Sequence, residues 1–222
     1  MSAEILPAVE VQTAPHPTAS VIWLHGLGAD GHDFEPAVPA LAVRGARALR
    51  FVFPHAPVRS VTLNGGAPMR AWYDILGFDR SAAQDEAGVR ASDRAIRALI
   101  GRENERGIAT ERIVLAGFSQ GGAMALFTGT RLSARLGGIV GLSCYLLLAE
   151  RLSEERSSAN QSTPILLAHG SQDSVVDVRL GEETRARLAA EGYPVEWHSY
   201  PMPHAVCAEE LAAVAGFLHR VL

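Results

Sequence analysis

Six short apolar runs recur along the chain, each about as long as a β-strand. The runs in the middle of the chain consist almost entirely of Val, Ile and Leu, which is typical of strands buried on both faces of a parallel sheet. We predict strands at residues 20–25, 48–53, 112–117, 137–143, 164–169 and 195–200. Because parallel strands need long crossover connections, this feature restricts the chain to folds that place helices between the strands.

Segments with apolar residues at helical spacing lie between these runs. The longest, at 81–106, has acidic residues early and a glycine after its end, as helices commonly do. The other predicted helices lie at 33–42, 120–131 and 178–191, and a final one is marked by Leu211, Val214, Leu218 and Val221. Strands alternating with helices predict an α/β fold with a mostly parallel central sheet and helices on both faces.

Composition narrows the class of protein further. A chain of 222 residues with 48% hydrophobic residues can bury one sizeable core, and we predict a single domain over 1–222. The net charge is −4 and no basic stripe is present, which argues against a nucleic-acid partner. We expect a cytoplasmic protein, since we find neither an apolar run of membrane-spanning length nor a secretory signal. The two cysteines, Cys144 and Cys207, are expected to be free thiols.

Two segments interrupt the alternation of strands and helices. Residues 54–78 are rich in Pro, Gly and Asn, and are too many for an ordinary strand-to-helix loop. Because the chain leaves no room for a large cap domain, this segment is the one sizeable candidate to cover a site. Residues 154–163 are polar and are predicted to form a surface excursion.

Ser119 lies in the sequence GFSQG (117–121), between a predicted strand and a predicted helix. A G-x-S-x-G pattern at such a junction is typical of a nucleophile elbow, a strained turn that exposes the serine at the C-terminal edge of the sheet. The neighbours must be small because the turn leaves little room for side chains. The alternative is a glycine-rich turn whose serine caps the helix or faces solvent.

His204 is the candidate base for this serine, whose hydroxyl is a poor nucleophile alone. It lies between the last predicted strand and the last predicted helix, which places it at the same sheet edge as Ser119. Pro201 and Pro203, which both come just before it, restrict the backbone and could fix the ring. The alternative is a loop histidine that caps the following helix.

An orienting carboxylate completes this pattern. Asp173 follows the predicted strand at 164–169, and Asp177 is the alternative, although Asp177 better suits the N-cap of the next helix. With Asp173, the chain order is Ser, Asp, His, which is the order expected of α/β-hydrolases.

Backbone N–H groups are the candidate donors to a reacting oxyanion. Gln120 directly follows the serine, and Leu27 lies in HGLG (25–28) after an early predicted strand. HGLG could also indicate a phosphate-binding loop, but the third glycine of a dinucleotide motif is not at the required spacing.

These stretches together resemble the small serine hydrolases that group bacterial carboxylesterases with acyl-protein thioesterases and lysophospholipases. The similarity extends over nearly the whole chain. The sequence MRAWYD is closer to that of the bacterial carboxylesterases. The matching stretches are HGLGADGHDF (25–34), FPHAPVRSVTLNGG (53–66), MRAWYDI (69–75), GFSQGG (117–122), HGSQDSVV (169–176) and PHAVCAEE (203–210).

The resemblance implies an α/β-hydrolase fold and the same site residues: the triad Ser119, Asp173 and His204, with oxyanion donors at Leu27 and Gln120. It further implies an acyl pocket, for most of whose residues ordinary packing is an equal alternative. The implied pocket residues are Leu63, Trp72, Leu76, Phe78, Tyr145 and Val175. Homodimers are common in the family, so a homodimer is implied too. Leu147 departs from the family, which commonly carries proline there.

We therefore expect a carboxylesterase that cleaves esters of short-to-medium acyl chains through an acyl-enzyme, without a metal or organic cofactor. The substrate is expected to be a small-molecule ester or thioester. An acyl-protein thioesterase or lysophospholipase is the first alternative. A non-catalytic binding module on the same scaffold is the second, and it would be expected to show a damaged triad or oxyanion loop.

Overall fold

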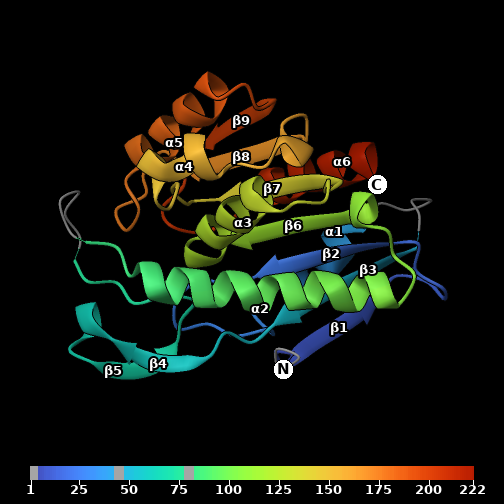
Figure 1. Ribbon diagram of the computed structural model, residues 1–222, viewed down its shortest axis with the longest axis horizontal. Coiled ribbons are helices and arrows are strands. Elements are labelled where there is room, and N and C mark those ends of the chain that lie inside the picture. Colours follow the sequence, from blue (N-terminus) through green and yellow to red (C-terminus); the bar gives the residue numbers. More distant parts are fainter. Residues whose placement is uncertain (1–4, 43–47, 78–82) are drawn as a thin grey trace.

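The computed structural model describes residues 5–42, 48–77 and 83–222. Within these residues, a seven-stranded sheet runs through the centre in the order β1-β3-β2-β6-β7-β8-β9 (Figure 1). Neighbouring strands are parallel except β1, which pairs with β3 in the antiparallel direction. This topology confirms the predicted α/β-hydrolase fold with a mostly parallel sheet, and in the described part of the chain no large cap domain covers it.

The strands lie within one residue of their predicted bounds. They are β2 (Ala19–Leu24), β3 (Leu49–Pro54), β6 (Ile113–Phe118), β7 (Gly138–Leu142), β8 (Ile165–Gly170) and β9 (Val195–Tyr200). The edge strand β1 (Ala8–Gln12) was not predicted, because its apolar residues alternate with polar ones over only five positions.

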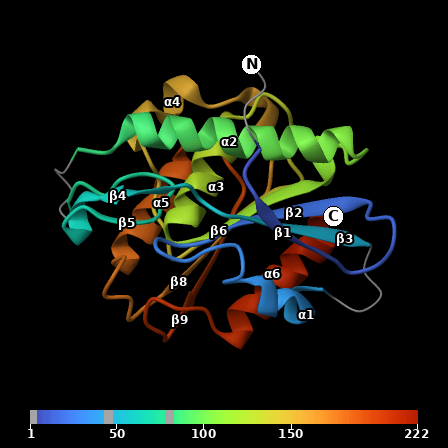
Figure 2. The same ribbon diagram turned by 90° about the horizontal axis from the view of Figure 1, so that it is seen from below.

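Helices cover both faces of this sheet. Figure 2 shows α2, α3 and α5 on one face and α1 and α6 on the other. Their bounds are α1 (Val38–Leu41), α2 (Glu86–Glu105), α3 (Gln120–Arg131), α4 (Leu152–Glu155), α5 (Val178–Ala190) and α6 (Ala208–Val221).

Two predicted helices are shorter in the structure. The segment 33–42 forms a 3-10 turn at Glu35–Ala37 and then the single turn of α1, since prolines in both turns remove backbone donors. Helix α2 begins at Glu86, after Asp85 accepts a hydrogen bond from the N–H of Gly88 at 2.9 Å. This cap marks the start of the helix, and residues 81 and 82 of the prediction lie outside the described residues.

Residues 54–77, the described part of the segment 54–78, contain more regular structure than a loop prediction suggests. It contains an antiparallel hairpin of β4 (Val58–Val61) and β5 (Ala67–Arg70), which lies beyond the left-hand end of the central sheet in Figure 1. The polar segment 154–163 includes the end of α4 and a 3-10 turn at Ser158–Asn160. The segment that we expected to cover a site therefore contains a regular hairpin.

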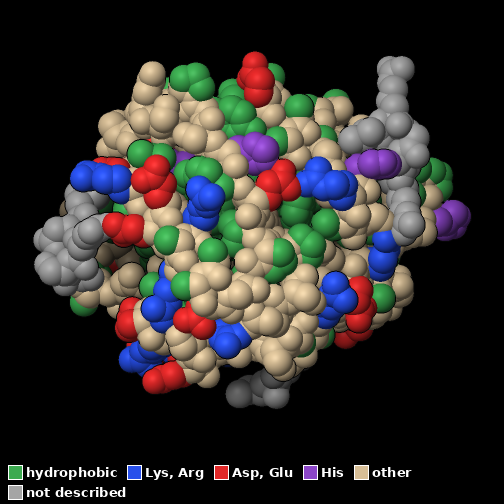
Figure 3. Space-filling view, turned by 90° about the horizontal axis from the view of Figure 1, so that it is seen from above, with side chains coloured by type: hydrophobic (Ala, Val, Ile, Leu, Met, Phe, Trp, Pro, Cys, Tyr) green, Lys and Arg blue, Asp and Glu red, His purple; other side chains and the backbone are tan. Residues whose placement is uncertain are grey.

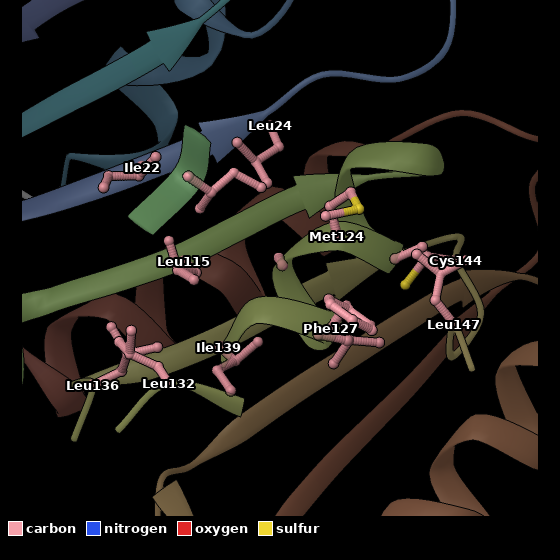
Figure 4. Packing of buried hydrophobic residues seen from close by; sticks show 14 of the residues in the cluster. Ile22, Leu24, Leu115, Met124, Phe127, Leu132, Leu136, Ile139, Cys144 and Leu147 are labelled. Atoms are coloured by element: carbon pink, nitrogen blue, oxygen red, sulfur yellow. The ribbon is translucent and has the colours of Figure 1, made fainter. Parts of the chain in front are cut away.

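The core consists of two hydrophobic clusters, one on each face of the sheet. The larger joins β2, β6 and β7 to α2 and α3, and Figure 4 shows Leu115 of β6 and Met124 and Phe127 of α3 within it. The second lies beneath α1 and α6. Packed on both faces, the strands provide a rigid edge from which the loops at their C-terminal ends begin.

Within the described residues, we find no helix long and apolar enough to cross a membrane. On the face in Figure 3, acidic and basic side chains are interspersed, in keeping with the sequence's lack of a basic stripe. Cys144 is buried and Cys207 is half-buried, and both are free thiols as predicted.

Glu210 is a fully buried carboxyl group in the first turn of α6. Neither of its oxygens has a hydrogen-bond partner among the described residues. Burial raises the pKa of Glu210 to about 8. Burial also raises the pKa values of Cys144 and Tyr200, with a smaller contribution from the Glu210 carboxylate. The folded protein therefore holds this group in its protonated form at neutral pH.

Replacement of Glu210 by Gln is expected to stabilise the protein at neutral and alkaline pH. Because the carboxyl titrates near 4.3 when unfolded, the wild type loses stability as pH rises from about 4 to about 8. The variant has no proton to lose, so its advantage should be near zero at pH 4 and reach a few kcal/mol by pH 8. Urea unfolding at pH 4, 6 and 8 measures this difference. A constant difference across that range would contradict a buried, protonated Glu210.

Candidate active site

Ser119 occupies a strained turn between β6 and α3. Its φ of 54° and ψ of −122° lie in a region that residues with a side chain rarely adopt. The glycines around it are sterically required: a Cβ on Gly121 would lie 2.1 Å from the carbonyl oxygen of Leu24, and one on Gly117 would lie 2.4 Å from the carbonyl oxygen of Gly121. The sequence GFSQGG therefore folds as a tight elbow that lifts Ser119 above the end of the sheet.

A chain of two hydrogen bonds joins this serine to a histidine and a carboxylate. The Nε2 atom of His204 lies 3.0 Å from the Oγ of Ser119, and its Nδ1 atom lies 2.6 Å from an Oδ of Asp173. A carboxylate accepts hydrogen bonds, so Nδ1 carries the proton and Nε2 is left to accept the serine hydroxyl proton. The structure thus brings the three predicted triad residues together.

Asp173 is held in place from the side opposite His204. Its second oxygen accepts the N–H groups of Val175 and Val176 at 2.9 and 2.8 Å, and the side chain is buried. Asp177, the alternative acid, instead caps α5 by accepting the N–H of Arg179 at 3.0 Å. The geometry therefore selects Asp173 as the partner of His204.

Two neighbouring rings support the triad and were not assigned to it from the sequence. Phe118 packs against the His204 imidazole with ring centroids 4.7 Å apart. His169 donates a hydrogen bond to the carbonyl of Val176 at 2.8 Å and lies 3.5 Å from Asp173. Burial lowers the pKa of His169, so this imidazole is neutral. The only feature of the sequence that could have placed His169 at the site was its position at the end of β8.

The two predicted oxyanion donors lie on backbone segments that pack against each other. A Cβ on Gly26 would lie 3.5 Å from the Cβ of Ser119, and one on Gly121 would lie 2.6 Å from the carbonyl oxygen of His25. Gln120 is the first residue of α3, where backbone N–H groups lack helical acceptors. In the described part of the chain, the Leu27 N–H donates to no backbone carbonyl. Gln120 and Leu27 therefore remain the candidate donors to a ligand beside Ser119.

The amide side chain of Gln120 has a second contribution that the sequence did not reveal. It is buried, accepts the N–H of Trp72 at 2.7 Å and donates to the carbonyl of Tyr73 at 2.8 Å. These bonds fasten the elbow to the segment that follows the hairpin. No local pattern could indicate them, because the partners lie nearly fifty residues away.

The implied pocket residues occupy different environments. Trp72 is completely buried and donates from its indole N–H to the carbonyl of His25 at 2.9 Å, which favours a packing role. Tyr145 is half-buried and shares a 2.9 Å hydroxyl–hydroxyl hydrogen bond with buried Tyr73. Leu63 is half-buried, and Leu76 and Val175 are 44% and 59% exposed.

Two further positions complete the comparison with the implied pocket. Phe78 lies outside the described residues. Leu147, where the family commonly has proline, is fully buried and lies beside Cys144 in the larger hydrophobic cluster (Figure 4). Its side chain therefore packs in the core instead of facing an open groove. Among the described residues, no group of three or more His, Cys, Asp or Glu side chains could hold a metal ion.

Fold and site together define the class: this is a serine hydrolase built on the α/β-hydrolase fold. Within that class, the chain belongs to the phospholipase/carboxylesterase family, whose model matches residues 6–222. Acyl-protein thioesterase 1 of Neurospora crassa is 42% identical over 221 residues, covering 96% of this chain and 90% of the relative.

Solved structures show the same likeness. Acyl-protein thioesterase 2 of Zea mays is 29% identical with a TM-score of 0.82, over 96% of this chain and 98% of that one. Esterase PE8 is 26% identical with a TM-score of 0.84, over 99% of this chain and all of the other. The family resemblance expected from the motifs is thereby confirmed.

Proposed function

We propose that this hydrolase is a carboxylesterase whose catalytic triad is Ser119, His204 and Asp173. The observation that carries the proposal is the unbroken hydrogen-bond chain, 3.0 Å from serine to imidazole and 2.6 Å from imidazole to carboxylate. It gives each group the protonation state that nucleophilic attack requires. A non-catalytic binding module would need neither this series of hydrogen bonds nor a serine in a strained turn.

The proposed reaction has two steps. His204 removes the proton from Ser119 as its Oγ attacks the acyl carbonyl, and the N–H groups of Leu27 and Gln120 stabilise the oxyanion. His204 then protonates the leaving alcohol, which leaves an acyl group on the serine. Water, activated by the same imidazole, attacks the acyl-enzyme and releases the acid. Asp173 holds the imidazole tautomer and stabilises its charged form.

The exposed apolar residues near the triad support a substrate with a short-to-medium acyl chain. The N–H of Val175 itself donates to Asp173. The 54–77 segment, which carries Leu63 and Leu76, is hydrogen-bonded to the elbow through Gln120. We also propose that the chain is a single domain, because the central sheet and both of its helical layers draw on residues throughout 8–221. We propose an open groove beside the triad, which would suit small esters.

The chain-length dependence of kcat/KM tests the substrate proposal. Across nitrophenyl esters of increasing acyl length, kcat/KM is expected to peak at short or medium chains, because Leu76 and Val175 are exposed to solvent and would bury little of a long chain. A steep, continuing rise towards long chains would contradict the open groove.

Thioester hydrolysis is the second candidate function. The 42% identity to a protein named acyl-protein thioesterase 1 favours it, and the same triad can expel a thiol. Matched oxygen ester and thioester substrates with one acyl group discriminate the two. A clearly higher kcat/KM for the thioester would assign this chain to the thioesterases.

A further inference from the structure

His25 is a buried histidine whose ring makes two directed hydrogen bonds. Its Nδ1 atom lies 2.7 Å from the carbonyl oxygen of Gly26, and its Nε2 atom accepts the N–H of Ala56 at 3.0 Å. A carbonyl oxygen only accepts and a backbone N–H only donates, so the ring must carry its single proton on Nδ1. The side chain is 1% exposed, so water does not compete for either bond.

The bonds of His25 belong to a clamp around the loop that holds Leu27. The Arg70 guanidinium donates to the carbonyl of Ala56 at 2.9 Å, and the Arg70 carbonyl accepts the N–H of Gly28 at 2.9 Å. The loop is therefore held at Gly26 by the imidazole and at Gly28 by β5. Between these two attachments lies Leu27, whose N–H makes no backbone hydrogen bond in the described part of the chain.

The backbone of His25 also contacts the nucleophile elbow. Its carbonyl accepts the indole N–H of Trp72 at 2.9 Å, and a Cβ on Gly121 would lie only 2.6 Å from that carbonyl oxygen. Gly26, the next residue, faces Ser119 directly. A shift of the His25 peptide would therefore change the distance between the Leu27 N–H and the serine.

The surroundings of His25 keep the ring neutral. Burial lowers its pKa; the Gly26 hydrogen bond and the carboxylate of Asp30 oppose this, while His55 and Arg70 lower the pKa further. A second proton on Nε2 would remove the acceptor for the Ala56 N–H. Protonation of His25 would therefore break the bond that joins the ring to Ala56.

We infer that His25, as the neutral Nδ1–H tautomer, is the positioning residue that sets the Leu27 N–H for the oxyanion. The inference rests on the proposed function, because it assigns a support to that oxyanion hole. Oxyanion donors act chiefly on the transition state, and loss of one lowers kcat by about 10²–10³. Displacing a donor should therefore lower kcat and leave KM largely unchanged.

Two substitutions separate positioning from general packing. His25→Leu removes both ring hydrogen bonds at similar volume and is expected to lower kcat by about 10²-fold with KM changed by less than about threefold. His25→Gln offers an oxygen that can accept the Ala56 N–H, so it should recover most of the lost kcat. His198→Leu, which removes a half-buried histidine from the edge strand β9, is the matched control and should keep wild-type kcat.

The outcomes distinguish this inference from the proposed function. A folded His25→Leu protein with wild-type kcat, or a Gln variant no better than Leu, overturns the role of His25. Wild-type protein that is not labelled on Ser119 by a fluorophosphonate overturns the triad instead.

Nuclear magnetic resonance of the wild type decides the matter if the Leu variant does not fold. Nε2 of His25 is expected to be unprotonated at neutral pH. Acidification should protonate it and shift the amide signals of Ala56 and Leu27 together. A protonated Nε2 at neutral pH would contradict the inference. So would a Leu27 amide signal that does not shift as His25 is protonated.

Discussion

Replacement of Ser119 by alanine is expected to abolish ester hydrolysis while the protein folds normally. Loss of a triad nucleophile lowers kcat by on the order of 10⁶-fold, because no other group can form the acyl-enzyme. The fold should persist since, among the described residues, the Ser119 side chain makes no helix-capping bond and hydrogen-bonds only to His204. Steady-state rates with a nitrophenyl ester, alongside circular dichroism, measure both effects.

Ser133→Ala is the matched control, because Ser133 is an exposed serine just beyond the end of α3. It should retain wild-type kcat and KM. If Ser119→Ala kept more than about a hundredth of the wild-type rate, Ser119 could not be the nucleophile, given the losses that triad knockouts cause.

Asp173→Asn is expected to cost about 10⁴-fold in kcat. The reason is that the two oxygens of this carboxylate have different hydrogen-bond partners. One oxygen accepts the N–H groups of Val175 and Val176, so the amide oxygen of an asparagine will take that position and its NH₂ will face His204. The imidazole must then accept at Nδ1 and carry its proton on Nε2, where it can no longer receive the serine proton.

The control for this prediction is Asp177→Asn. Asparagine caps helices about as well as aspartate does, so both stability and kcat should stay close to wild type. Equal losses in the two variants would mean that a general loss of negative charge in this loop, and not the tautomer of His204, explains the effect. pH–rate profiles of both variants add a readout independent of the absolute rate.

Most of the fold could be predicted because the strand-length apolar runs in the sequence form the strands of the central sheet. The sequences that form β6 and β8 are almost continuous in apolar residues. Their hydrophobic pattern and their length therefore both indicated buried strands. The predictions fell short where proline and capping chemistry intervene, at 33–42 and at the start of α2. The hairpin of β4 and β5 was missed because its strands are short and largely exposed.

The candidate triad could be predicted because each member follows a strand, and parallel strands bring their C-terminal ends to one edge. The supports of the site could not. The bonds from the Gln120 amide to Trp72 and Tyr73, and from the His25 ring to Ala56, join segments dozens of residues apart. Each depends on which side chain faces which backbone group, and spacing along the chain does not contain that information.

In the proposed reaction, Ser119 is activated by His204 and attacks the acyl carbon. The most direct test is the intact mass of the protein after treatment with a fluorophosphonate, followed by peptide mapping of the adduct. We expect one adduct per chain, located on Ser119, and no adduct in Ser119→Ala under the same conditions. An unmodified wild-type protein, or an adduct on another residue, would contradict the account.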